Sequence, residues 1–147
     1  MADLTWREVE IVDAMVALLD QQKEVLKIKR VYWGDQNKIP DYPSVCVAPF
    51  PKDRALTGEG ATHRFAIQHR IGIYVYHGEV GSAEINQREA ALLAEDIEAT
   101  LHLNTDLAGL VIFGFVSLMQ PGFTIRENTV VKVTRLQWEA RSRQNFN

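Results

Sequence analysis

The chain has 147 residues, 46% of them hydrophobic and 24% charged, with a formal net charge of −3. This composition is typical of one globular domain with a buried core, and it excludes intrinsic disorder, which needs lower hydrophobicity and a larger net charge. The small negative charge argues against a general nucleic-acid binder, although residues 1–27 (−3) and 82–104 (−4) are acidic while residues 63–77 (+2) and 123–147 (+3) are basic.

The N-terminal segment is predicted to form an amphipathic helix over about residues 5–23. Thr5 and Glu8 have the spacing of a capping box at its start. Apolar residues then recur at helical spacing, namely Val9, Val12, Met15, Val16 and Leu19. The segment has no continuous apolar core, so we expect no signal peptide, and no apolar run in the chain is long enough for a membrane span.

The next segments read as short strands and loops. Val31-Tyr32-Trp33 predicts a short strand, residues 35–42 a loop, and residues 44–49 a strand that follows Pro43. Cys46 lies inside this apolar strand and is interpreted as a buried structural thiol, as expected in a reducing cytosol. Residues 51–62 contain two glycines and no periodicity, which predicts a mobile loop.

Residues 63–77 show the clearest pattern, an alternation of period two that predicts a strand with one buried face. One parity is apolar: Phe65, Ile67, Ile71, Ile73 and Val75. The other parity holds Arg64, Gln68, Arg70, Tyr74 and Tyr76. The strand would be roughly 45 Å long, more than double the usual length, so we expect a neighbouring subunit to cover part of it.

After a turn at residues 77–81, a second helix is predicted from an N-cap at Ser82 to about residue 103, ended by Asn104. Its predicted buried face consists of Ala90, Leu93, Ala94, Ile97 and Leu101. Its predicted solvated face is acidic and consists of Glu89, Glu95, Asp96 and Glu98.

The C-terminal third is predicted to be two strands. Residues 107–119 form a nearly unbroken apolar run, interpreted as a strand buried on both faces, and Pro121-Gly122 is interpreted as the following turn. In the last strand, over residues 129–143, the apolar parity changes from Val131/Val133 to Leu136/Trp138/Ala140. Either a β-bulge near Thr134-Arg135 or burial of opposite faces against two partners would explain this change.

These elements predict an α+β fold, with a mostly antiparallel twisted sheet of long strands and two amphipathic helices packed on one face. We expect one domain over residues 1–147, with a short C-terminal tail at 144–147.

No catalytic, cofactor-binding or metal site can be built from the sequence, so we expect a protein that is not an enzyme and has no cofactor. His63, His69 and His77 would stand roughly 20 Å or more apart along an extended strand, too far for one metal shell. The chain has no Gly-x-Ser-x-Gly motif, and Cys46 lies where a thiolate is disfavoured.

The polar parity of the long strand has two interpretations. Arginine and tyrosine side chains could stack on single-stranded nucleic acid. Alternatively, this sheet face is exposed to solvent or packed on another subunit, where both residue types are enriched. The candidate subunit or partner interface is Arg64, Gln68, Arg70, Tyr74, Tyr76, Arg135, Arg141 and Arg143.

Several segments, spread over most of the chain, share the pattern of one protein family. They are Ala17-Leu18-Leu19, Val31-Tyr32-Trp33, Ile39-Pro40-Asp41-Tyr42-Pro43, Ile71-Gly72-Ile73-Tyr74-Val75-Tyr76, Leu93-Ala94-Glu95-Asp96-Ile97-Glu98-Ala99-Thr100-Leu101 and Ala140-Arg141-Ser142-Arg143. This pattern resembles the tail-terminator (tail completion) proteins of tailed bacteriophages. The resemblance implies a small α+β protein that forms a hexameric ring on the last ring of tail-tube protein, stops tube growth and offers a surface to the head-side connector.

The resemblance also implies partners and a location. We expect a homo-oligomeric ring that contacts tail-tube protein, a head-tail connector or neck protein and, in a contractile tail, sheath protein, with DNA only passing through the channel and no membrane contact. The loop expected to face the tube or channel contains Lys52, Asp53, Arg54 and Glu59. The expected location is the head-proximal end of the virion tail, and the host cytoplasm during assembly. Another neck or head-closure connector, or a nucleic-acid-binding module, are the alternatives.

Overall fold

The computed structural model describes most of the chain. The described residues are 8–34, 36, 39–49, 54–56, 64–80, 87–105, 107, 111, 113–126 and 128–145; at 54–56, 64–68, 87 and 142–145 only the backbone is described. The helices are α1 (Glu8–Gln21), α2 (Lys23–Leu26) and α3 (Gln87–His102). The strands are β1 (Arg30–Trp33), β2 (Ser44–Pro49), β3 (Arg54–Leu56), β4 (Arg64–Glu79), β5 (Phe113–Arg126) and β6 (Thr129–Asn145).

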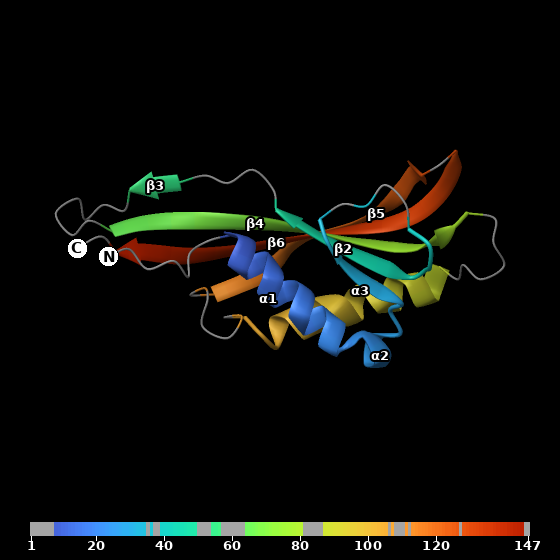
Figure 1. Cartoon of the computed structure of the whole chain (residues 1–147), viewed down its shortest axis with the longest axis horizontal. Helices are drawn as coiled ribbons and strands as arrows, with labels where there is room; N and C mark the ends of the chain where they lie inside the picture. The colour runs from blue at the N-terminus through green and yellow to red at the C-terminus, as the bar shows by residue number, and fades with distance from the viewer. Residues whose placement is uncertain are drawn as a thin grey trace.

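The strands form one mixed sheet. Its order is β1-β2-β4-β6-β5, and β3 pairs with β4 beyond the end of β2. Only β1 and β2 are parallel, and the other pairs are antiparallel. Helices α1 and α3 lie on the same side of this sheet (Figure 1), with α1 packed on β1 and β2 and α3 on β5 and β6. The predicted α+β fold is confirmed.

The main core lies between the helices and the sheet. Its fully buried side chains include Ile11, Met15 and Leu19 from α1, Ile97 and Leu101 from α3, and Ile71, Ile73, Leu136 and Trp138 from the sheet. The predicted apolar face of α3 is therefore confirmed, and that of α1 is confirmed except at Val9, which is 57% exposed. At the end of α3 the Asn104 side chain donates to the carbonyl of Thr100 at 2.9 Å, which satisfies one free carbonyl of the last turn.

A second, smaller core lies on the opposite face of the sheet. Ile39, Cys46, Tyr76 and Val131 are buried there, and Tyr32, Tyr42, Tyr74 and Val133 pack against them. Cys46 is thus the buried thiol that the sequence predicts. Val131 and Val133 point to this core, whereas Leu136 and Trp138 point to the main core.

The change of parity in β6 therefore reflects burial of opposite faces, the second of the two explanations. No bulge lies at Thr134-Arg135, because Thr134 pairs with Val75 and Arg135 with Tyr74 without a shift of register. The register shifts lie in the neighbouring strands, at His77 in β4 and at Ser117 in β5.

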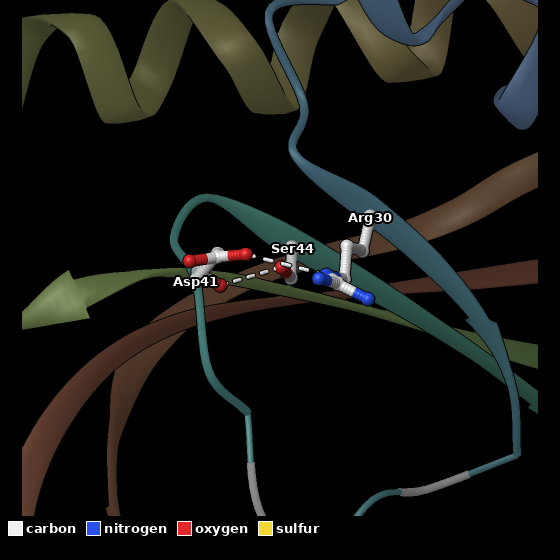
Figure 2. Close-up of polar contacts among 3 residues, drawn as sticks. All are labelled: Arg30, Asp41 and Ser44. Carbon is white, nitrogen blue, oxygen red and sulfur yellow. Dashed lines mark hydrogen bonds and ion pairs between the residues drawn. The ribbon is translucent and has the colours of Figure 1, made fainter.

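Polar contacts hold the chain between β1 and β2 against the sheet. Asp41 accepts a hydrogen bond from Arg30 Nε at 3.2 Å, and its carbonyl accepts one from the Ser44 hydroxyl at 2.6 Å (Figure 2). On the other side, Arg126 Nη1 donates to the carbonyl of Gln36 at 2.8 Å, while Arg126 Nη2 donates to the Tyr76 hydroxyl. These bonds connect the segment between β1 and β2, which covers the second core, to the strands beneath it.

Strand β5 differs most from its prediction. It begins at Phe113 rather than residue 107, is not buried on both faces, and runs through Pro121-Gly122 to Arg126. The chain reverses at Asn128, whose φ is 63°. Among the described strands, β5 is the last in the order, so no strand pairs with its outer edge there. An edge strand tolerates proline where the missing N–H would point away from the ladder.

Pro121 occupies such an outward position. The amides of Gly114 and Val116 bond away from β6, to the Thr105 carbonyl and the His102 ring respectively. Before the bulge, the amides that point away from β6 belong to even-numbered residues. The extra residue at Ser117 shifts the alternation by one, so after it the outward positions are odd-numbered, and Pro121 is one of them.

Two smaller differences concern the predicted loops and caps. Arg54–Leu56, inside the predicted mobile loop, form β3 and pair with Phe65–Ile67 of β4. The proposed caps at Thr5 and Ser82, and the rest of the loop at 51–62, lie outside the described residues.

Candidate functional site

The candidate site is the part of the sheet surface that faces away from the helices and is not covered by the second core. We call it the open face, and define it as Arg70, Phe113, Phe115, Leu118, Arg135, Glu139 and Arg141. Register brings these residues together across three strands. Gln68, Arg141 and Phe113 form one cross-strand row, Arg70, Glu139 and Phe115 the next, and Tyr74, Arg135 and Gln120 another.

Apolar side chains lie along one margin of the open face. Phe113, Phe115 and Leu118 of β5 are 54%, 43% and 40% exposed, and the two phenylalanine rings are 6.1 Å apart. Large apolar residues that gather on a surface, beside charged ones, are typical of an interaction site. The sequence analysis missed them, because it placed residues 107–119 in the interior.

The charged part of the open face is basic. Among its described side chains are three arginines and one glutamate, a net charge of +2. Arg70 Nε lies 3.2 Å from Glu139 Oε1, and Arg135 Nη2 donates to Gln120 Oε1 at 2.9 Å. Arg141 is exposed. The predicted basic character of this surface therefore appears in the structure with Arg70, Arg135 and Arg141 on the same face.

Two predicted interface residues belong elsewhere. Tyr76 is only 3% exposed and is part of the second core, and Tyr74 is half-buried against the same core. Their parity was predicted correctly, but the chain before β2 folds over that end of the face. This cover could not be predicted, because it depends on the Arg126 contacts to Gln36 and Tyr76 across the sheet.

The remaining predicted residues lie in an extension of the sheet, which we call the arm: residues 64–68 of β4, 141–145 of β6 and β3. It contains Arg64, Gln68, Arg143 and Arg54, whose side chains are outside the described set, as are Lys52, Asp53 and Glu59 altogether. The long strands are confirmed: β4 has 16 residues and β6 has 17.

The arm projects past the helices (Figure 1).

A buried polar pair marks the base of the arm. His69 is fully buried, and its Nδ1 lies 3.1 Å from Oε2 of Glu8 in the first turn of α1. The parity predicted for His69 is confirmed. Its partner was not predicted, because Glu8 was assigned to a capping box. The contact ties the start of α1 to the point where β4 leaves the core.

His77 is the extra residue of the β4 bulge and lies on the helix side of the sheet. Its Nε2 is 2.8 Å from the Thr134 hydroxyl. Burial, and then the nearby charge of Lys132, lower the pKa of His77 from 6.5 to about 4. The imidazole also lines a half-open cleft of about 460 Å³ between α2 and α3, together with Leu26 and Leu93.

Neither a metal centre nor a membrane helix is found in the described part of the chain. No three His, Cys, Asp or Glu side chains gather there as a metal site would require. None of the described helices is long and apolar enough to cross a membrane.

Comparison with known proteins adds a similarity of fold. No protein-family model and no curated protein matches the sequence. Among solved structures, the chain is similar to a chain described as "Virion of native gene transfer agent (GTA) particle", with a TM-score of 0.59 and 17% identity over 89% of this chain and 92% of that chain. The two chains therefore have a similar fold over most of their lengths.

Proposed function

We propose that this protein is a structural component of a phage-like virion and assembles with copies of itself. The observation that carries this proposal is the open face. Its apolar residues Phe113, Phe115 and Leu118 lie on the edge strand β5 and are exposed beside the arginines of β4 and β6. A neighbouring copy would bury these side chains, which contributes about 25 cal/mol for each Å² of apolar surface removed from water. The similar fold of a chain in a gene transfer agent virion supports the proposal.

The specific role that we propose is that of a tail terminator. Copies form a ring, six in number, on the head-proximal end of the tail tube. The ring ends tube polymerisation and provides the surface to which the neck or head attaches. We assign no catalytic role to the chain. DNA would pass through the ring without being read, and the tube and neck proteins would be its partners.

The arm gives this role a physical basis. Five residues at the ends of β4 and β6 extend the sheet by about 17 Å beyond the His69–Glu8 pair. A ribbon of this length, without a described core of its own, is stabilised when it lies on another subunit. Backbone pairing with β3 already protects part of one edge of the arm.

The alternative of a nucleic-acid-binding module has less support. Stacking of bases requires exposed aromatic rings among the arginines. Tyr76 is buried and engaged by Arg126, whose guanidinium carbon lies 5.0 Å from the ring centroid. The two tyrosines proposed for stacking are therefore covered within the chain, Tyr74 in part and Tyr76 fully. The exposed rings beside the arginines are those of Phe113 and Phe115, so the cover of the tyrosines and the formal net charge of −3 together disfavour this alternative.

Controlled polymerisation of a tail-tube protein in the presence of this chain tests the role directly. Purified chain, added at substoichiometric amounts to polymerising tube protein, is expected to shorten the tubes and to sit at one end in negative-stain images. Ring formation without any effect on tube length would favour the connector alternative. A protein that neither self-associates nor binds tubes would contradict the proposed function.

A further inference from the structure

The outward side of α3 is a second exposed surface, on the opposite side of the sheet from the open face. Leu92, Glu95, Asp96, Ala99 and Leu103 follow one another at helical spacing on the side of the helix that faces away from the core, and all are exposed, Leu103 at 84%. We call these five residues the helix stripe. It combines apolar side chains with two carboxylates.

We infer that the helix stripe of one copy docks on the open face of the next copy. This inference rests on the proposed function, because it requires that the chain assembles with itself. The charges are complementary: the described open face carries a net charge of +2, and the helix stripe carries Glu95 and Asp96, a net charge of −2. Each surface also exposes apolar side chains, Phe113, Phe115 and Leu118 on one and Leu92 and Leu103 on the other.

The two surfaces also match in length. From Leu92 to Leu103 the helix stripe extends about 17 Å at 1.5 Å per residue. The apolar row of β5 from Phe113 to Leu118 also extends about 17 Å at 3.3 Å per residue. A helix laid along this edge can therefore contact the apolar row over its whole length while its carboxylates reach the arginines.

The position of these surfaces dictates the kind of assembly. They lie on opposite sides of the same sheet, so the two cannot meet within one chain. A contact between two different surfaces is heterologous, and it generates a closed ring if the rotation closes and a filament if it does not. A two-fold dimer, in which one surface contacts its own copy, would instead place arginines against arginines.

Helix α1 is also acidic but fits the open face less well. Its exposed side chains include Asp13 and Asp20, and among them only Val9 is a large apolar residue. Asp20 already lies 3.5 Å from Lys23. The same charge change on α1 therefore serves as a matched control for a change on α3.

Charge reversal of the two surfaces, followed by mixing, tests the pairing. The helix variant is Glu95→Lys with Asp96→Lys, the face variant is Arg135→Glu with Arg141→Glu, and the control is Asp13→Lys with Asp20→Lys. Sedimentation of each chain alone is expected to show self-association weakened by about a hundredfold in the helix and face variants but not in the control. Circular dichroism checks the fold, and Arg141→Glu alone replaces the face variant if the double change unfolds it.

Mixing the helix and face variants is expected to restore association, because each reversed surface then meets a partner of opposite charge. Restored association supports the inference. Variants that stay monomeric when mixed, or a helix variant that associates like the wild-type chain, would overturn it. In either case a wild-type chain that still forms rings leaves the proposed function standing, whereas a wild-type monomer contradicts the proposed function itself.

Discussion

Gly114 is the position where a single methyl group should matter most. A Cβ at this residue would lie 2.0 Å from Cζ2 of Trp138, which is fully buried in the main core. We predict that Gly114→Ala lowers the free energy of unfolding by about 3 kcal/mol, because the indole cannot move away without disturbing its neighbours. Gly122→Ala in the same strand is the control, since nothing lies within 4 Å of its added Cβ, and it should be neutral or slightly stabilising. Urea unfolding of both variants measures the difference, and equal losses would contradict the packing argument.

His77 should make the stability of the fold sensitive to acid. Its pKa is about 4 in the folded protein and 6.5 in the unfolded chain, so between these values the unfolded chain binds more protons. The stability associated with a neutral His77 is therefore complete above about pH 6.5 and is lost as the pH falls toward 4. We predict that His77→Gln, which can still bond the Thr134 hydroxyl, reduces the loss of stability between pH 7 and pH 4.5 by about 2 kcal/mol. Denaturant titrations of both proteins at the two pH values measure this, and parallel losses would contradict it.

At the scale of elements, the spacing of apolar residues along the sequence predicts which side of a helix or strand is buried. The 3.6-residue spacing predicted the buried face of α3 and, except at Val9, that of α1. The alternation in residues 63–77 predicted β4 and the side to which His69 points. These patterns come from burial of one face, which the sequence records directly.

Elements whose position depends on distant contacts could not be predicted in this way. The strand assignment of residues 107–119 counted apolar residues as buried, but β5 lies at the edge, where Phe113 and Phe115 are exposed. Pro121 was read as a turn residue because its place on an unpaired edge depends on the order of strands. The candidate site was half predicted for the same reason: the arginines follow from parity, whereas the apolar row of β5 and the burial of Tyr76 depend on the topology.

Two sets of contacts connect the segment between β1 and β2 to the sheet, and their contributions to stability can be compared. Arg126 bonds Gln36 and Tyr76 in a partly buried setting, whereas the ion pair of Arg30 with Asp41 has both side chains more than half exposed. We predict that Arg126→Leu costs about 2 kcal/mol and that Arg30→Leu costs less than about 1 kcal/mol. Hydrogen exchange should then be faster at Ile39 in the first variant only, with α1 unchanged. The reverse order of the two costs would contradict this account of the cover.

The apolar row of the open face should matter more for assembly than for folding. We predict that Phe115→Ser with Leu118→Ser lowers the unfolding free energy of the monomer by about 2–3 kcal/mol, because each side chain is more than half buried. The same change should abolish self-association, since the exposed part of both side chains is what a neighbouring copy would cover. Val25→Ser, at a residue of α2 that is 78% exposed, is the control and should associate normally. Self-association that survives the double substitution would exclude this row from the contact.

At the scale of the whole molecule, the described chain forms an α+β structure with helices on one side of a sheet. Apolar and charged side chains that take no part in its core are exposed on both sides of the sheet. In the proposed ring, the open face and the helix stripe would contact the copies on either side. The arm, which adjoins the open face at Arg141, would be left to contact one further neighbour.

The mass of the purified protein in solution tests the central claim, that the exposed β surface is covered by copies of the same chain. Analytical ultracentrifugation over a range of concentrations, alone and with tube protein, measures it. Six copies of 16.7 kDa predict a species of about 100 kDa. A single species of 16.7 kDa under all of these conditions would contradict the account.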